Sequence, residues 1–138
     1  MTSGESVILL VDDEPWLTQA LLFSLEAADF KCVVATDVSE AMHIMRSMRV
    51  RALVTDIMMP AGADYPEVDS SVGGFHLIKL VRSGWRDVPI VCLSVIGDQE
   101  KIKSLTRQGI RYLRKGETPL STAVEVVAAV ATGRRIKL

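Results

Sequence analysis

The run Ala52-Leu53-Val54-Thr55-Asp56-Ile57 constrains the fold of this chain more than any other segment. Apolar and β-branched residues lead into a single carboxylate, Asp56, and Pro60 ends the run. A short, nearly uninterrupted run of this kind predicts a strand buried on both faces, which is typical of a parallel sheet. Asp56 would then lie at the carboxyl end of the strand, where open α/β sheets bind their ligands. A carboxylate that is buried there needs a partner, because burying an unpaired charge is costly.

Four further apolar runs and five segments of helical periodicity complete this pattern. The other strands are predicted at 7–11, 31–35, 88–95 and 110–113. The helices are predicted over 15–28, from a capping Ser39 to Met48, and over 75–82, 98–108 and 118–132. The alternation is (βα)5, which favours an α/β fold with a doubly wound parallel sheet and helices on both faces.

Length, composition and charge indicate one globular domain spanning residues 1–138. The chain is 49% hydrophobic and 24% charged, and its net charge of −1 argues against direct binding of nucleic acid or an anionic membrane. Its longest apolar run, Val7 to Val11, is too short to span a bilayer, and residues 1–6 carry no basic signal region. We therefore expect a cytoplasmic protein. Its two cysteines, Cys32 and Cys92, are expected to be reduced thiols buried in strands.

The segment 61–74 interrupts the periodic pattern. It contains glycines, a proline, serines and the acids Asp64, Glu67 and Asp69, and shows neither helical nor strand periodicity. This composition predicts a long loop, and loops of this length inside a compact domain are usually functional or mobile. Residues 133–138 are interpreted as the possible start of a linker.

Polar residues gather where the predicted strands end. Asp12 and Asp13 follow the first strand, Asp56 ends the third, Ser94 ends the fourth, and Lys115 follows the fifth. Because parallel strands end at one edge of a sheet, these side chains are expected to meet there. Three carboxylates repel one another unless a cation lies between them, and oxygen ligands alone favour Mg²⁺. The added hydroxyl and ammonium groups indicate phosphoryl transfer onto a carboxylate.

With these residues in view, the sequence resembles the receiver domain of bacterial two-component response regulators. The resemblance extends from Val7 to about Ile136 and rests on five motifs in order: Val11-Asp12-Asp13-Glu14-Pro15, Thr55-Asp56-Ile57-Met58-Met59-Pro60, Gly73-Gly74, Leu93-Ser94 and Tyr112-Leu113-Arg114-Lys115. The resemblance implies a flavodoxin-like fold with strand order 2-1-3-4-5.

The resemblance also implies a role for each site residue. Asp56 would accept the phosphoryl group, and the carboxylates of Asp13 and Asp56 would ligate Mg²⁺ together with the backbone carbonyl of Met58. Asp12 would act on the metal through water. Ser94 would hydrogen-bond the phosphoryl oxygens and Lys115 would form an ion pair with them.

Tyr112 and Ser94 would form the switch of such a domain. When Ser94 moves toward the added charge, Tyr112 can turn into the space that it leaves. A sensor histidine kinase or a phosphotransfer protein would supply the phosphoryl group in a phosphorelay. The face built from 98–108, 110–113 and 118–132 would serve a homodimer or an output domain.

Three features depart from the family pattern. The loop after Pro60 is longer than the usual link, and Gly116 follows Lys115 where many receivers have a proline. Met58 and Ile96 occupy the positions that flank the hydrolytic water in this family, and neither side chain can hydrogen-bond. We therefore expect a long-lived phosphorylated state.

We interpret the chain as a phosphorylation-dependent signalling switch, one that modifies itself and is not an enzyme acting on an external substrate. The alternative is a phosphate-independent interaction module whose long loop blocks the site. A phosphohydrolase with an aspartyl nucleophile would need a second acid at the position that Met58 occupies.

His43 and His76 are single histidines on predicted helices, where surface or half-buried positions are expected. Trp16 is expected either near the acidic cluster or packed at the start of its helix.

Overall fold

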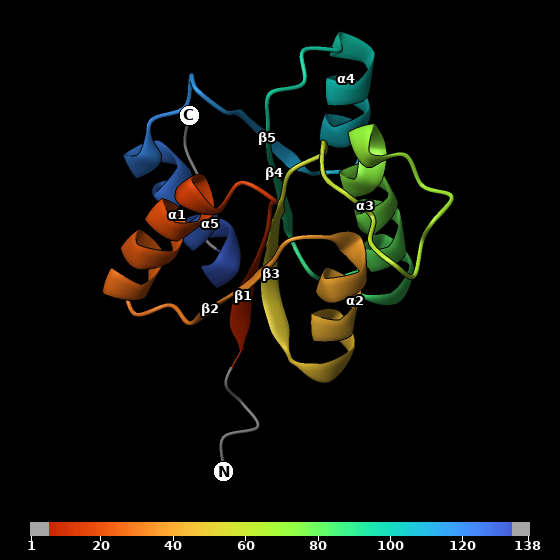
Figure 1. Cartoon of the computed structure of the whole chain (residues 1–138). Helices are drawn as coiled ribbons and strands as arrows, with labels where there is room; N and C mark the ends of the chain where they lie inside the picture. The colour runs from red at the N-terminus through yellow and green to blue at the C-terminus, as the bar shows by residue number, and fades with distance from the viewer. Residues whose placement is uncertain (1–5, 134–138) are drawn as a thin grey trace.

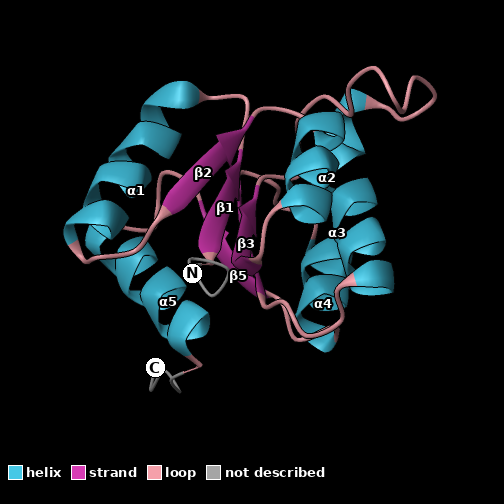
Figure 2. Cartoon of the chain, turned by 90° about the horizontal axis from the view of Figure 1, so that it is seen from below, coloured by secondary structure: helices cyan, strands magenta, loops and turns pink. Residues whose placement is uncertain are grey.

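The computed structural model describes residues 6–133 and shows a five-stranded parallel sheet between two layers of helices (Figure 1). The strand order is β2-β1-β3-β4-β5, which confirms the predicted doubly wound fold. Viewed from below, α1 and α5 cover one face of the sheet, and α2, α3 and α4 cover the other (Figure 2).

The strands are β1(Val7–Val11), β2(Cys32–Ala35), β3(Val50–Thr55), β4(Ile90–Ser94) and β5(Arg111–Arg114). The helices are α1(Pro15–Ala27), α2(Val38–Ser47), α3(Gly73–Gly84), α4(Gln99–Arg107) and α5(Leu120–Thr132), with a 3₁₀ turn η1(Ser70–Val72) before α3. No helix in this part of the chain is both long and apolar enough to cross a membrane.

The central strands are mostly apolar because helices cover both of their faces, and β1 is apolar at every position. Successive side chains of a strand point to opposite faces, so neighbouring residues enter different cores. In β1, Leu9 and Val11 pack in the core on the side of α2 and α3, and Ile8 and Leu10 pack in the core on the side of α1 and α5. A charged residue at any of these positions would be buried on one face or the other.

The cap of α2 differs from the prediction. Asp37, and not Ser39, precedes the helix, and its carboxylate accepts a hydrogen bond from the backbone N–H of Glu40 at 2.7 Å. The helix begins at Val38, whose side chain is fully buried, so Ser39 falls in the first turn. The Ser39 hydroxyl donates instead to the carbonyl of Ala61 at 3.2 Å.

The segment after β3 is a loop as predicted, but α3 begins at Gly73 and the loop is anchored at both ends. Ser39 Oγ accepts a hydrogen bond from the Asp64 N–H at 3.0 Å, and Tyr65 packs edge-on against His76 with ring centroids 4.8 Å apart. Figure 1 shows this loop on the side of α2 and α3. Gly62 has a φ of 94° and lies against Asp37, where a side chain would be strained.

Helix α5 ends at Thr132 and is capped by a glycine in the left-handed conformation. Gly133 has a φ of 74°, and its N–H donates to the last turn. The rest of the linker predicted over 133–138 lies outside the described residues. So does the end of the region that resembles receiver domains, which was predicted to extend to about Ile136.

Candidate functional site

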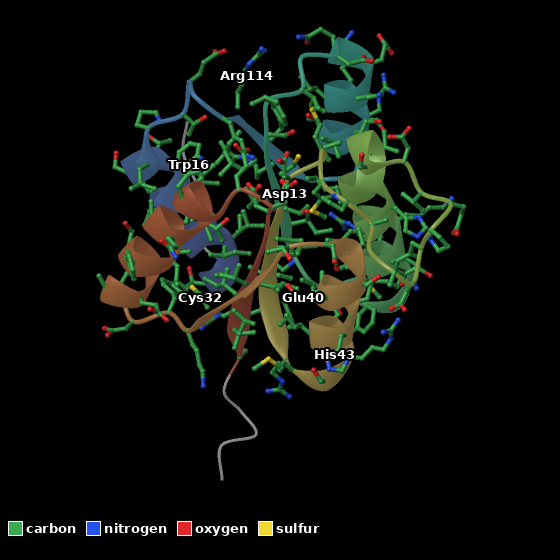
Figure 3. All side chains as sticks on the ribbon, viewed as in Figure 1. Asp13, Trp16, Cys32, Glu40, His43 and Arg114 are labelled. Carbon is green, nitrogen blue, oxygen red and sulfur yellow. The ribbon has the colours of Figure 1, made fainter. Side chains whose placement is uncertain are left out.

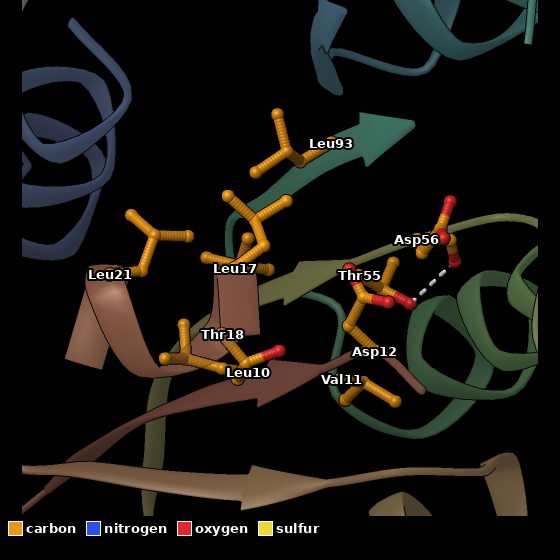
Figure 4. A pocket seen from close by; sticks show the side chains of 10 residues that line it. Leu10, Val11, Asp12, Leu17, Thr18, Leu21, Thr55, Asp56 and Leu93 are labelled. Atoms are coloured by element: carbon orange, nitrogen blue, oxygen red, sulfur yellow. Dashed lines mark hydrogen bonds between the residues drawn. The ribbon is translucent and has the colours of Figure 1, made fainter. Parts of the chain in front are cut away.

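The predicted site residues meet at the carboxyl edge of the sheet. The register pairs Val11 of β1 with Thr55 of β3, and the N–H of Asp56 donates to the Val11 carbonyl at 3.0 Å. Asp12 and Asp56 therefore leave neighbouring strands side by side, as the close view shows (Figure 4). Ser94 ends β4 next to β3, and its carbonyl accepts a hydrogen bond from the N–H of Lys115 at 2.9 Å.

Asp12, Asp13 and Asp56 form a cluster that could hold a metal ion. Each offers an oxygen, and these oxygens lie within 4.8 Å of one another. Asp12 and Asp56 are buried, and Asp13 is exposed at the edge of the sheet (Figure 3). Three carboxylates with one open side suit a hard divalent cation that keeps some of its water. The predicted role of the Met58 carbonyl stays a prediction, because only the Met58 N–H is described near Asp56, 3.4 Å from its Oδ1.

Lys115 lies at the centre of the acidic residues. Its Nζ is 2.7 Å from Asp56 Oδ2, 2.8 Å from Asp12 Oδ2 and 2.7 Å from Glu14 Oε1. An ammonium group has three N–H donors, so all three are used. Burial by itself lowers the pKa of Lys115, but these hydrogen bonds outweigh it and the pKa is raised. Lys115 is therefore a fixed positive charge beside Asp56.

Glu14 was not predicted to belong to the site. Its position after the pair Asp12-Asp13 was the available signal, because all three acids directly follow a buried strand. Glu14 also precedes α1, where its N–H donates to Asp12 Oδ1 at 3.0 Å. This hydrogen bond keeps Glu14 and Asp12 close together at the end of β1.

The electrostatics of Asp12 show the cost of clustering acids. Burial raises the pKa of Asp12, and its hydrogen bonds with Lys115 and with the Glu14 N–H only partly offset this. The Asp56 carboxylate raises the pKa of Asp12 further. A cation bound between the acids would favour their charged forms.

Two glycines allow α3 to approach the backbone that carries Asp56. A Cβ on Gly74 would lie 1.9 Å from the Asp56 carbonyl oxygen, and one on Gly73 would lie 2.1 Å from the Met59 carbonyl oxygen. The N–H of Gly74 donates to the Ile57 carbonyl at 2.9 Å. The Gly73-Gly74 motif is therefore a steric requirement of the turn after β3.

Ser94 and Tyr112 lie on the neighbouring strands β4 and β5. Ser94 is fully buried, and among the described residues its hydroxyl has no hydrogen-bond partner. The Tyr112 hydroxyl donates to the carbonyls of Ile96 and Ser94, and so ties the loop after β4 to β5. Burial raises the pKa of Tyr112, so the phenol, which is protonated at neutral pH in any case, stays a donor to higher pH than an exposed tyrosine. A buried, unpartnered hydroxyl at the end of β4 can donate to an anion bound at this edge.

Several exposed apolar side chains surround the same edge. Met58 is 47% exposed and Val95 is 51% exposed, whereas Asp56 is 4% exposed. Trp16 lies in the first turn of α1 and is 67% exposed, so it is not packed at the helix start (Figure 3). The contacts described for the long loop go to α2, α3 and the core.

The two histidines lie elsewhere. His43 is exposed on α2, and His76 is half-buried on α3 against Tyr65. Neither belongs to the acidic cluster. Their placement agrees with the ordinary helix positions expected for them.

A fold of this kind, with three acids and a lysine at its carboxyl edge, defines a class of signalling domain. Residues 8–125 match the family "Response regulator receiver domain", so the chain belongs to this family. The response regulator GtcR of Aneurinibacillus migulanus is 30% identical over 122 residues, which cover 88% of this chain and 46% of that protein. The phosphate regulon transcriptional regulatory protein PhoB of Escherichia coli (strain K12) is 26% identical over 126 residues, covering 89% of this chain and 51% of PhoB. The chain thus spans about half the length of both regulators.

Solved structures show the same fold. A CheY-like receiver domain from Methanospirillum hungatei JF-1 superposes with a TM-score of 0.78 at 14% identity, covering 94% of this chain and 96% of that one. The non-phosphorylated HemR receiver domain of Leptospira biflexa has a TM-score of 0.77 at 21% identity and covers 97% and 100%. At these identities the likeness concerns the fold alone.

Proposed function

We propose that this chain is a phosphorylation-dependent signalling switch that accepts a phosphoryl group on Asp56 in the presence of Mg²⁺. The observation that supports this most directly is the placement of Lys115 Nζ 2.7 Å from Asp56 Oδ2, inside a cluster of acids that could hold a metal. An ion pair between Lys115 and Asp56 alone would not require the further acids Asp12, Asp13 and Glu14 around it. A site that must accept both a cation and a phosphoryl group needs this arrangement.

The chemistry of the transfer follows from the side chains. An oxygen of Asp56 forms a bond to phosphorus as the bond from phosphorus to a donor histidine nitrogen breaks, and the nitrogen keeps the electron pair. A bound Mg²⁺ would be held by Asp12, Asp13 and Asp56. It would neutralise these acids and polarise the phosphoryl oxygens. Lys115 supplies a second positive charge, and the Ser94 hydroxyl donates a hydrogen bond to a phosphoryl oxygen.

The output follows from the link between Ser94 and Tyr112. A phosphoryl group adds up to about two negative charges, which attract the Ser94 hydroxyl. The Tyr112 hydroxyl is bonded to the carbonyl of Ser94, so a shift at Ser94 changes a contact that ties the loop before α4 to β5. We propose the face of α4, β5 and α5 as the surface that reads this change, for a homodimer or an output domain.

The proposed donor is a sensor histidine kinase or a phosphotransfer protein, in the cytoplasm. The domain promotes only its own phosphorylation and dephosphorylation.

The phosphate-independent alternative requires the long loop to block the site. The described contacts of that loop, with Ser39 and His76 among others, place it against α2 and α3, and this favours the switch.

Incubation with labelled acetyl phosphate and Mg²⁺ tests the proposal. The parent protein should take up one label, and Asp56→Asn or excess EDTA should abolish it. Asp64→Asn is a matched control, because it removes an exposed acid of the loop and should leave labelling unchanged. Equal labelling of Asp56→Asn and parent would refute the assignment of the phosphoacceptor, and an unlabelled parent would favour the phosphate-independent module.

A further inference from the structure

Glu14 has a contact that the metal cluster does not explain. Its carboxylate accepts from Lys115 Nζ at 2.7 Å, as close as the buried Asp56 does. The side chain of Glu14 is 46% exposed, whereas that of Lys115 is 5% exposed. The lysine is thus buried at the site, and Glu14 reaches it from the solvent side.

Lys115 and a divalent cation would draw on the same two buried carboxylates. Asp12 and Asp56 belong to the cluster that could hold a metal, and both also bind Lys115. Their other oxygens are engaged as well: Asp12 Oδ1 accepts from the Glu14 N–H at 3.0 Å and Asp56 Oδ1 accepts from the Ile57 N–H at 2.7 Å. A cation that enters must therefore share or take over oxygens that already serve Lys115 or a backbone N–H, and it lies close to the ammonium group in either case.

Among the described residues, Glu14 is the one acidic partner of Lys115 that lies outside the metal cluster. An ammonium group and a divalent cation repel each other at short distance. An ammonium that moves toward Glu14 keeps one full charge partner while it gives up Asp12 and Asp56. Without Glu14 it would keep none, and a buried charge left without a partner is strongly unfavourable.

We propose that Glu14 is a positioning residue that holds Lys115 at the edge of the site when a cation occupies the shared carboxylates. This inference rests on the proposed function, because it concerns the cation and the phosphoryl group of that same site. Held by Glu14, Lys115 stays within reach of a phosphoryl group on Asp56. Glu14 thereby couples cation binding to the placement of the lysine.

Mg²⁺ titration of the unphosphorylated protein, followed by tryptophan fluorescence, tests the coupling without any catalytic readout. Trp16 lies two residues from Glu14 and is exposed, so it can report binding. Glu14→Gln should raise the dissociation constant for Mg²⁺ about fivefold to tenfold, as expected for loss of a partly exposed charged hydrogen bond. In a Lys115→Met background, Glu14→Gln should change it less than about twofold, because no ammonium remains to be held.

Two further variants test whether the length of the Glu14 side chain matters as well as its charge. Glu14→Asp keeps the charge but shortens the side chain by one methylene, and should weaken Mg²⁺ binding nearly as much as Glu14→Gln. Glu117→Gln removes an exposed acid that pairs with Arg114 at 2.9 Å, and should leave binding unchanged. If Lys115→Met does not fold, the comparison of these two variants with Glu14→Gln decides the question.

The outcomes are distinct. An equal loss of affinity from Glu14→Gln in both backgrounds would show that Glu14 binds the cation directly or acts only by its charge, and would overturn the proposal. So would unchanged binding in both Glu14→Gln and Glu14→Asp. With saturating Mg²⁺, Glu14→Gln should also slow labelling from acetyl phosphate at least about twofold, because Lys115 is less well placed. A parent that binds Mg²⁺ but takes up no label would instead contradict the proposed function.

Discussion

Replacing Gly74 by alanine tests how closely α3 must approach the phosphoacceptor turn. The added Cβ would lie 1.9 Å from the Asp56 carbonyl oxygen and 2.5 Å from the Ile57 Cα. Ordinary contacts with carbon are about 3.5 Å, so the two segments would have to separate by roughly 1.5 Å. Both obstacles are backbone atoms, which cannot move aside by changing rotamer.

The cost can be worked out from these contacts. Overpacking typically costs about 1–3 kcal/mol, and a backbone obstacle belongs at the upper end. Separation also weakens the hydrogen bond from the Gly74 N–H to the Ile57 carbonyl, worth about 1 kcal/mol. The better helix propensity of alanine returns up to about 1 kcal/mol. We expect Gly74→Ala to lower the free energy of unfolding by about 3 kcal/mol.

Gly84→Ala is the matched control. Gly84 ends the same helix, and a Cβ there would meet nothing within 4 Å. This variant should be neutral or more stable by up to about 1 kcal/mol. Urea unfolding followed by circular dichroism gives both free energies and their m-values. A Gly74→Ala protein as stable as the parent, with an unchanged m-value, would refute the steric argument.

Three further predictions concern the edge of the site and the cysteines. Met58→Asn should speed the loss of the phosphoryl group at neutral pH by about tenfold or more, because an amide can position the attacking water; equal half-lives in variant and parent would contradict this. Burial raises the pKa of Cys92 to about 12 and that of Cys32 to about 11. Because the thiolate is the reactive form, alkylation of both cysteines by iodoacetamide should be slow at pH 8. The rate should increase as the pH rises toward these values, and it should increase first at Cys32. The two cysteines should form no intramolecular disulfide, because β2 and β4 lie three places apart in the sheet, about 14 Å at the usual spacing; detection of that disulfide by mass spectrometry would contradict the strand order.

Local pattern was enough to predict the class of fold and most of the candidate site, whereas the strand order came from the resemblance to receiver domains. Strands covered on both faces are apolar at most positions, so runs such as Val7–Val11 are visible without any structure. Parallel strands then bring the residues that follow them to one edge, which is why Asp12, Asp56 and Lys115 could be grouped from their positions alone.

The tertiary structure decided which of several locally equivalent partners each group uses. Asp37 and Ser39 are both good helix caps, and the burial of Val38 selected Asp37. Glu14 resembles any exposed acid at a helix start, and only the convergence of the segments that follow β1 and β5 at the carboxyl edge of the sheet brings it onto Lys115. Residue pattern determines which face or edge a side chain occupies, because strand and helix periods are local properties. The choice among neighbours a few ångströms apart depends on how separate elements pack, so the network around Lys115 exists only in the folded chain.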